Sequence, residues 1–238
     1  MIVEVCIDSV ESALAAQEGG ASRVELCAEL DKGGITPSAG MIEQVCKSVR
    51  IGVHVMIRPR PGDFCYSDHE FDVMKKDIQI ARQLGAHGVV LGVLTRDRTV
   101  DIPRTNALAA LARPMAVTFH RAFDESANLD AAMENLIGLG IDRILTSGGK
   151  PSALEGAGKI TELVQRSNGR VAIVAGAGIT LENASAIITR TGVGEIHVRS
   201  AVTRVVGNVP RRGSLFDLPR AVVDPQAVKS FLDVVQRG

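Results

Sequence analysis

The sequence predicts a single-domain α/β protein with the architecture of a (β/α)8 TIM-type barrel. Eight short runs rich in β-branched residues alternate with eight longer amphipathic segments, and each pair occupies about 30 residues. Such alternation implies parallel strands joined by right-handed crossovers, and eight units fill the 238 residues. Hydrophobic residues make up 45% of the chain but aromatic residues only 3%, which is typical of buried parallel strands. We therefore expect one domain over residues 1–238.

The expected elements follow one another in strict order along the chain. The strands are short and β-branched, and they cover residues 2–8, 23–27, 52–59, 88–94, 115–122, 143–147, 171–175 and 195–200. The helices carry apolar residues at helical spacing, and they cover residues 10–17, 38–49, 67–84, 101–112, 128–139, 152–166, 180–190 and 225–236. Boundary signals support four helices: Gly19-Gly20 after the first, Thr36-Pro37 before the second, the capping box of Ser67 and Glu70 before the third, and Asp224-Pro225 before the last.

An open doubly wound sheet is the alternative to a closed barrel. Such a sheet usually has a glycine fingerprint after its first strand, whereas residues 6–9 read Cys-Ile-Asp-Ser here. The least regular stretch is 201–223, which is too long for a simple turn and contains Arg204, Arg211 and Arg212. We expect an irregular loop there, before the last helix, that acts as a lid or a subunit contact.

Composition excludes several classes of protein. Basic and acidic side chains number 27 each, so the neutral chain lacks the basic face that a dedicated nucleic-acid binder needs. No apolar run approaches the roughly 20 residues that span a bilayer, and the N-terminus lacks a signal-peptide pattern. We therefore expect a cytoplasmic protein without nucleic-acid or membrane partners. The four cysteines are then expected to be free thiols, and the lack of a CxxC pair argues against structural zinc.

Strand parity predicts a polar barrel interior. Alternate residues of each strand point inward, and the C-terminal strand ends meet at one mouth. Because unpaired buried charge is costly, inward ionisable groups should pair with one another or face a wet pocket. One such network would pair Glu4 and Glu25 with Arg58 and the histidines, and it could be purely a satisfied polar core. The residues that share one face are Glu4, Cys6 and Asp8; Glu25 and Cys27; His54, Met56 and Arg58; Thr118 and His120; His197 and Arg199.

The segment after the third strand offers two arginines beside prolines. Arg58 and Arg60 are rigidly placed donors for a carboxylate or a phosphate of a ligand. The alternative is that they form ion pairs with a loop carboxylate such as Asp63 or Asp124.

The fifth strand ends in a second polar group. His120 is a candidate general base or ligand, with Arg121 beside it and Asp124 as a carboxylate that could orient it. A structural role for this histidine is equally compatible with the sequence.

Glycine-rich turns follow the sixth and seventh strands. Ser147 and Gly148 lie in the first turn, and Gly176 and Gly178 lie in the second. Such turns expose backbone N–H groups, and barrels often bind phosphate near their last strands, where Ser200 could add a hydroxyl. The alternative is that the glycines only permit tight turn geometry.

Several motifs together resemble the CutC family. The resemblance implies a TIM-like barrel, a cytoplasmic setting, a homodimer or higher homo-oligomer, and a role in copper homeostasis with copper binding. Cu(I) prefers thiolate and thioether ligands, and Cys27, Cys6 and Met56 share one parity on three successive strands. Filling the core is the alternative role for these three residues. The motifs are RVELC (23–27), GGITPS (33–38), IRPR (57–60), GDFCYSD (62–68), FHRAFD (119–124), LTSG (145–148) and AGAG (175–178).

Three functions remain open from the sequence. The first is a copper-handling protein that binds Cu(I) through Cys27 and another sulfur. The second is an enzyme for a small anionic metabolite, phosphorylated or not, whose reactive cluster at the mouth is Glu4, Glu25, Arg58 and His120. Schiff-base chemistry is disfavoured because no lysine lies inside an expected strand. The third is a non-catalytic scaffold without an open pocket.

Overall fold

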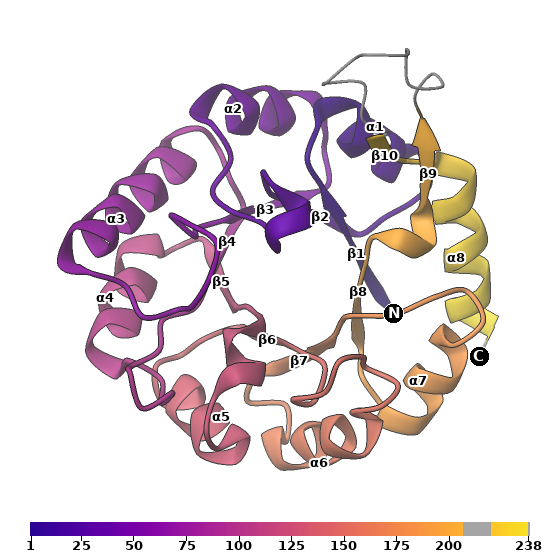
Figure 1. Cartoon of the computed structure of the whole chain (residues 1–238). Coiled ribbons are helices and arrows are strands. Elements are labelled where there is room, and N and C mark those ends of the chain that lie inside the picture. Colours follow the sequence, from indigo (N-terminus) through magenta and orange to yellow (C-terminus); the bar gives the residue numbers. More distant parts are fainter. Residues whose placement is uncertain (207–219, 238) are drawn as a thin grey trace, which may run out of the picture.

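A computed structural model describes residues 1–206 and 220–237, and in it the strands close into a barrel. All eight barrel strands are parallel and pair in chain order, with β1 closing against β8 (Figure 1). The predicted fold class is confirmed. The strands are β1 (Ile2–Ile7), β2 (Arg23–Leu26), β3 (Gly52–Met56), β4 (Gly88–Leu91), β5 (Ala116–Phe119), β6 (Arg143–Thr146), β7 (Ala172–Ala175) and β8 (Glu195–Val198).

A ring of helices surrounds the barrel (Figure 1). Side chains cap several of their first turns: Ser9 accepts from the backbone of Ser12, and Ser67 and Glu70 complete the predicted capping box. The helices are α1 (Val10–Glu18), α2 (Ala39–Ser48), α3 (Asp68–Gln83), α4 (Ile102–Ala112), α5 (Leu129–Gly138), α6 (Ala157–Ser167), α7 (Ala184–Thr191) and α8 (Pro225–Arg237).

Two helices begin later than predicted, for local reasons. Before α6, the chain packs so closely on the β6 turn that a Cβ on Gly156 would lie 1.8 Å from the carbonyl oxygen of Ser147. Before α7, Asn183 accepts a hydrogen bond from Thr180 N and donates one to Gly178 O, which holds a turn.

Within 201–223, where an irregular loop is predicted, the described residues form regular elements. After a short 3-10 helix, η3 (Ser200–Val202), β9 (Thr203–Val206) pairs antiparallel with β10 (Arg220–Val223). The prediction was wrong there because pairing of the two valine-containing segments depends on contacts distant in sequence. Val223 N donates to Ser12 Oγ at 3.4 Å, which ties β10 to α1. Arg211 and Arg212 lie outside the described residues.

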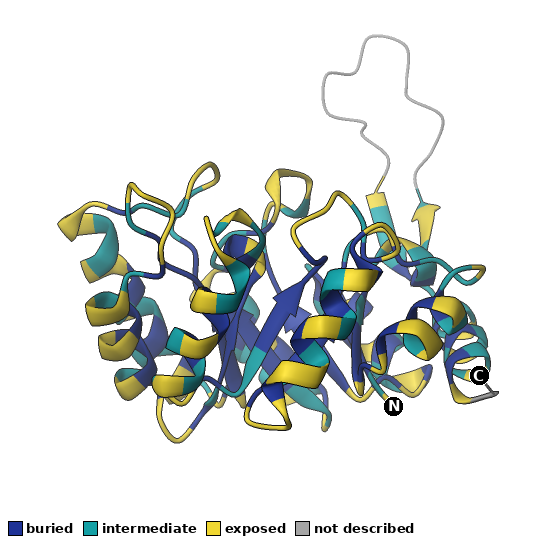
Figure 2. Ribbon diagram, turned by 90° about the horizontal axis from the view of Figure 1, so that it is seen from below, coloured by how far each residue is buried: buried dark blue, intermediate teal, exposed yellow. Residues whose placement is uncertain are grey.

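Strand parity divides the interior into two parts. Outward residues of β1, namely Val3, Val5 and Ile7, join the main apolar core between strands and helices. Figure 2 shows the buried strands at the centre and exposed residues on the outer faces of the helices. Inward residues instead form the polar barrel interior described below. The C-terminal strand ends, which form the mouth, lie on the same side as the β9–β10 hairpin, opposite the N-terminus (Figure 2).

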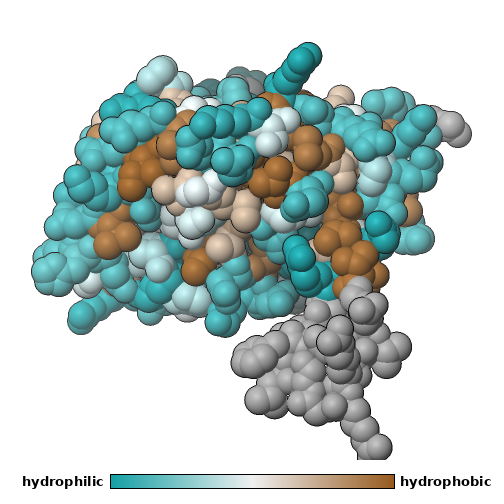
Figure 3. Space-filling view, turned by 90° about the horizontal axis from the view of Figure 1, so that it is seen from above, coloured by the Kyte–Doolittle hydropathy of each residue, from teal (hydrophilic) through white to brown (hydrophobic). Residues whose placement is uncertain are grey.

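The outer surface over α1 and α2 is mainly hydrophilic, with small separate hydrophobic groups (Figure 3). Val205 in β9 is 73% exposed. None of the helices described here combines the length and the apolar composition that crossing a membrane requires.

Candidate functional site

A buried ion-pair network fills the barrel interior toward the N-terminal ends of the strands. Arg23 Nε lies 2.5 Å from Glu4 Oε2, and Arg23 Nη2 lies 2.6 Å from Glu195 Oε2. Arg143 Nε adds a contact of 3.0 Å to the same oxygen of Glu195. Parity reasoning overlooked Arg23, Arg143 and Glu195, although Arg23 lies two residues before Glu25 and Glu195 two residues before His197 on the same strands. Glu4 is thus paired with Arg23 and not with the expected Arg58, whereas Glu25 has no arginine partner among the described residues.

His197 connects this network to the mouth. Its Nδ1 lies 2.8 Å from Glu4 Oε1, and its Nε2 lies 3.9 Å from Glu25 Oε2. Burial disfavours the charged imidazole, but Glu25, Cys6 and Glu4 outweigh it and raise the pKa of His197 well above its usual value. His54 is different: burial lowers its pKa to about 4, so it is neutral at physiological pH.

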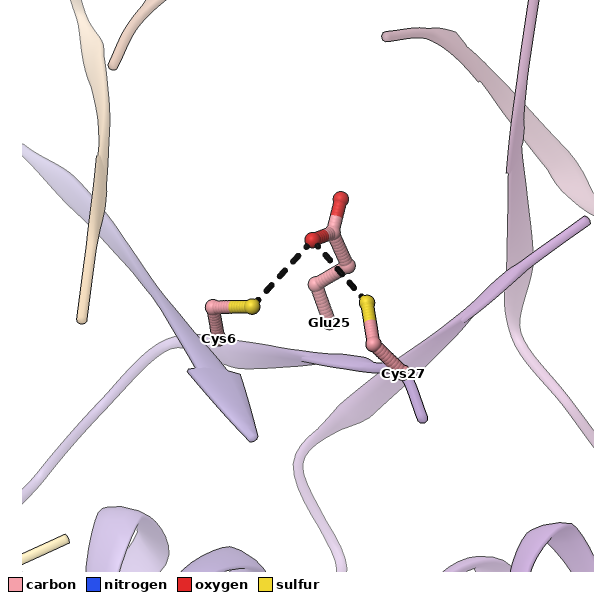
Figure 4. Close-up of side chains that lie close together, drawn as sticks. All are labelled: Cys6, Glu25 and Cys27. Atoms are coloured by element: carbon pink, nitrogen blue, oxygen red, sulfur yellow. Dashed lines mark hydrogen bonds between the residues drawn. The ribbon is translucent and has the colours of Figure 1, made fainter. Parts of the chain in front are cut away.

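Two thiols share one carboxylate at the centre of the mouth (Figure 4). The Sγ atoms of Cys6 and Cys27 lie 3.4 and 3.5 Å from Glu25 Oε2. One ligand atom from each of the three residues lies within 4.8 Å of the others. Met56 belongs to the same small buried cluster as both cysteines, together with Val90. The structure therefore brings together all three sulfur residues predicted from parity.

The two thiols differ in their protonation. Hydrogen bonding by Cys27 lowers the pKa of Cys6 to about 5 despite burial, and His197 contributes in the same direction. The same hydrogen bond, together with burial, raises the pKa of Cys27 well above its usual value. Burial also raises the pKa of Glu25 to about 8, against the attraction of His197. One thiol of the pair therefore loses its proton readily, as a metal-binding thiolate must.

Arg58 holds the loop that covers these thiols. Its Nη1 donates to the carbonyl oxygens of Lys32, Gly33 and Gly34 at 3.3, 3.2 and 3.0 Å, and its Nη2 donates to Gly62 O at 2.7 Å. Gly34 adopts φ +81, and a Cβ there would lie 3.1 Å from Cys27 Sγ. Arg58 is thus a clamp for the cover of the sulfur cluster, and its Nη atoms are not free for a ligand.

His120 keeps a free donor. Its Nδ1 accepts a hydrogen bond from Ala122 N at 3.1 Å, so the hydrogen of the neutral ring is on Nε2. Among the described residues Nε2 has no hydrogen-bond partner. Burial, with the nearby charge of Arg58, lowers the pKa of His120 to about 3, which keeps the ring neutral. Asp124 does not orient this histidine, because the carboxylate is engaged elsewhere.

Arg60 forms ion pairs with the protein's own carboxylates, which is the alternative to binding a ligand. It binds Asp63 at 2.9 Å and Glu70 at 2.5 Å, and it packs over the ring of Tyr66. Neither Arg60 nor Asp63 lines the central cavity.

Asp124 fills the glycine turn after β6. Its carboxylate accepts hydrogen bonds from Ser147 N and Gly149 N at 3.1 and 3.0 Å, from Thr146 Oγ1 at 2.5 Å and from Arg121 Nε at 2.8 Å. Gly148 N donates to Thr146 Oγ1 at 2.8 Å. The N–H groups expected to hold a ligand anion here are therefore already bound to the protein's own side chains.

The mouth contains a cavity of about 410 Å³. Of the predicted site residues, it leaves out Glu4, Arg60, Asp63, Asp124, Ser147, Gly148 and Gly176. Gly176 is packed against neighbours instead, because a Cβ there would lie 2.7 Å from Leu145 Cδ1. The cavity brings together Cys6, Glu25, Cys27, Met56, Arg58, His120, Arg121, Gly178, His197 and Ser200.

The expected reactive cluster is divided between two roles. Glu4 serves the ion-pair network and does not line the cavity, whereas Arg58, Glu25 and His120 border it, with Arg58 acting as the loop clamp. Within the described chain, Glu25 Oε1, Arg58 Nε and His120 Nε2 have no hydrogen-bond partner. The arrangement can therefore bind a soft metal at the sulfurs and a polar ligand above them.

Comparisons with known proteins identify close relatives. The CutC family model matches residues 1–202. The copper homeostasis protein cutC homolog of Homo sapiens is 48% identical over 214 residues, which are 90% of this chain and 78% of the human protein. A CutC family protein of Vibrio parahaemolyticus is 47% identical over 204 residues, covering 85% of this chain and 83% of that protein.

Solved structures show the same fold. The crystal structure of CutC from Streptococcus agalactiae has a TM-score of 0.78 at 35% identity, and the match covers 83% of this chain and 97% of that one. Thiamine phosphate pyrophosphorylase from Pyrococcus furiosus has a TM-score of 0.64 at 19% identity over 99% of this chain and 96% of that one. At that identity the second match supports the fold alone.

Proposed function

The chain belongs to the CutC family, and from this premise we propose that it acts in copper homeostasis by binding Cu(I) at Cys6 and Cys27. The observation that carries the proposal is the position of the two thiols, which lie on adjacent strands with their sulfurs beside one oxygen of Glu25. Both thiols are buried, yet both border the cavity at the mouth. An ion could therefore reach them through this cavity.

The donor set suits Cu(I) as a cargo. Thiolate and thioether sulfurs are soft ligands, and Cu(I) prefers them over carboxylates. The two sulfurs and an oxygen of Glu25 all lie within 4.8 Å of one another, so one ion could contact both sulfurs at once. Met56 packs in the same cluster and can supply a third sulfur. Cys6 would already be a thiolate at neutral pH because its pKa is about 5, so Cu(I) binding would displace the proton of Cys27. The positive charge of His197 would then offset the negative charge of the thiolates.

Two further expectations belong to this proposal. Reduced thiols persist in the cytoplasm, which is the location that we expect for the protein. A homodimer or higher homo-oligomer is the expected assembly, and light scattering of the purified protein tests it. Copper is the partner that the proposal requires.

The test is an anaerobic Cu(I) titration in competition with a chromogenic Cu(I) chelator. We expect Cys27→Ser and Cys6→Ser each to weaken Cu(I) binding by more than about tenfold, which is about 1.4 kcal/mol. Cys46→Ser is the matched control, because Cys46 lies in α2 and does not line the cavity. Unchanged affinity in both Cys6→Ser and Cys27→Ser would refute this site, provided that circular dichroism shows both variants to be folded.

A further inference from the structure

The rim of the cavity at β7 and β8 is chemically separate from the sulfur cluster. Ala177, Gly178 and Ile179 line the cavity on one strand end, and Arg199 and Ser200 line it on the next. These two strand ends are neighbours, since β7 pairs with β8. The copper proposal uses none of these residues.

In the turn after β7, two carbonyl oxygens bind neighbouring parts of the protein, and the N–H groups of the same peptide units point the opposite way. Ala177 O accepts a hydrogen bond from Ala153 N at 3.0 Å, and Gly178 O accepts one from Asn183 Nδ2 at 2.8 Å. In a planar trans peptide the N–H points opposite to the carbonyl oxygen of the same unit. The N–H groups of Gly178 and Ile179 therefore point away from Ala153 and Asn183, which do not line the cavity, whereas Gly178 and Ile179 do.

These N–H groups are available to a ligand. Neither Gly178 N nor Ile179 N donates a hydrogen bond to another described residue. The turn has consecutive positive φ values, +77 at Ala177 and +65 at Gly178. Ala177 is unusual in this respect because a residue with a Cβ rarely adopts the left-handed region. Consecutive free N–H groups of this kind attract anions.

The charge on the rim fits the same ligand. Arg199 is 31% exposed on its side chain, and its ion-pair contact is to Asp31 at 3.7 Å, whose side chain is 97% exposed. Because this ion pair is long and exposed to solvent, it contributes little to stability and leaves the guanidinium of Arg199 available to a ligand. Four basic side chains border the cavity, Lys32, Arg58, Arg121 and Arg199, against two carboxylates, Glu25 and Glu125.

A buried histidine independently indicates a ligand in the cavity. His120 is 4% exposed and borders the cavity, and its Nε2–H has no partner among the described residues. A buried donor without a partner costs free energy, which a ligand oxygen would recover. The cavity therefore offers an anion site at one side and a hydrogen-bond donor for an uncharged oxygen at another.

We propose that the mouth binds a small phosphomonoester, whose phosphate contacts Gly178 N, Ile179 N and Arg199 and whose organic part accepts a hydrogen bond from His120. Phosphate is favoured over a carboxylate because its several oxygens can satisfy two N–H groups and a guanidinium together. The cavity of about 410 Å³ has room for such a molecule above the thiols. This binding goes beyond the copper proposal and does not depend on it.

The test uses metal-free protein in the presence of a chelator, with inorganic phosphate and glycerol 3-phosphate as probes in isothermal titration calorimetry. We expect glycerol 3-phosphate to bind more tightly than phosphate, and Arg199→Gln to weaken both by about tenfold or more. Arg190→Gln is the matched control, because Arg190 is exposed on α7 and does not line the cavity. We expect Cys27→Ser to retain phosphate binding, which separates failure of this proposal from failure of the copper proposal.

A second variant distinguishes the two ends of the ligand. His120→Asn should weaken glycerol 3-phosphate several-fold and leave inorganic phosphate unchanged, whereas a general loss of structure would affect both. Equal affinities in wild type and Arg199→Gln would show an adventitious ion only and would overturn the proposal. Tighter binding of malonate than of glycerol 3-phosphate would also overturn it, because the site would then be one for carboxylates.

Discussion

Arg58 donates a hydrogen bond from Nη1 to the carbonyl oxygen of Gly34 over 3.0 Å. Gly34 in turn lies so close to Cys27 that a Cβ on the glycine would be 3.1 Å from the sulfur. An arginine from the end of β3 therefore holds the backbone that covers a thiol at the end of β2. Access to the sulfur cluster depends on how firmly this arginine binds the cover.

Removing the clamp should expose Cys27. In Arg58→Met the apolar stem is kept, but the four hydrogen bonds to carbonyl oxygens are lost. We expect the rate at which an aromatic disulfide reagent labels Cys27 to rise about tenfold, because local opening of the loop costs about 1.4 kcal/mol less. Mass spectrometry of labelled peptides reports the rate at each cysteine.

Arg60→Met is the control for this experiment. Arg60 belongs to the same motif, but it binds Asp63 and Glu70 and does not line the cavity. Its loss should leave the labelling of Cys27 unchanged. If Arg58→Met and Arg60→Met label at the same rate, Arg58 does not act as a clamp.

The buried ion pair between Glu4 and Arg23 should be sensitive to loss of one charge. In Glu4→Gln the one remaining carbonyl oxygen can accept from Arg23 or from His197 but not from both. Among the described residues the guanidinium then keeps Glu195 as its carboxylate partner. Removing one member of a buried ion pair lowers the free energy of unfolding by about 3–5 kcal/mol. We expect a decrease near the lower end of this range because glutamine keeps the shape of the glutamate side chain. Urea denaturation measures it. Glu29→Gln removes the exposed pair with Lys32 and should cost less than about 0.5 kcal/mol.

Strand periodicity was sufficient to predict which residues face the barrel interior. Cys6, Cys27 and Met56 meet as expected because a period of two fixes the face of each strand. Periodicity could not predict which charges pair, because that depends on how neighbouring strands are staggered. The register places Glu4 beside Arg23 and His197, whereas Arg58 lies beyond the end of β3 and meets the loop instead.

The glycine turns show a second limit of sequence reasoning. Both the turn after β6 and the turn after β7 have the composition of an anion site. The first is already filled by the carboxylate of Asp124, which is distant in sequence from Ser147 and Gly149. The second has N–H groups without such a partner among the described residues. Both turns contain two glycines among small residues, and only the folded chain shows which of them has free N–H groups.

Asp124 should therefore stabilise the β6 turn as an internal anion. In Asp124→Asn the amide nitrogen is a donor, and in either orientation it faces donors that now bind the carboxylate, such as Arg121 Nε or Gly149 N. Hydrogen bonds to a charged group contribute about 1.5–3 kcal/mol, so we expect a loss of about 2 kcal/mol. Calorimetry should show a decrease in Tm of about 4–8 °C. Asp63→Asn, at a side chain that is 73% exposed, should leave Tm nearly unchanged.

Acid should destabilise the fold through its neutral buried histidines. Burial lowers the pKa of His54 to about 4 and, with Arg58, that of His120 to about 3. Between pH 6.5 and 4 the unfolded chain therefore binds protons at these histidines that the folded chain does not. Stability then falls as pH falls, by up to about 1.4 kcal/mol per pH unit for each histidine. Glu25 acts in the opposite direction over this window, because burial raises its pKa to about 8.

A comparison of variants isolates the contribution of His120 from these opposing effects. His120→Asn removes a group that binds a proton in the unfolded chain but not in the folded one. The free energy of unfolding should therefore fall less steeply with decreasing pH between pH 6 and 4.5, and the slope should differ from that of the wild type by about 1 kcal/mol per pH unit. Urea denaturation at several pH values measures this slope. His69→Asn, at an exposed histidine, should retain the wild-type slope. A wild-type slope in His120→Asn would mean that His120 is charged in the folded protein, in conflict with the free Nε2–H donor on which the phosphomonoester site depends.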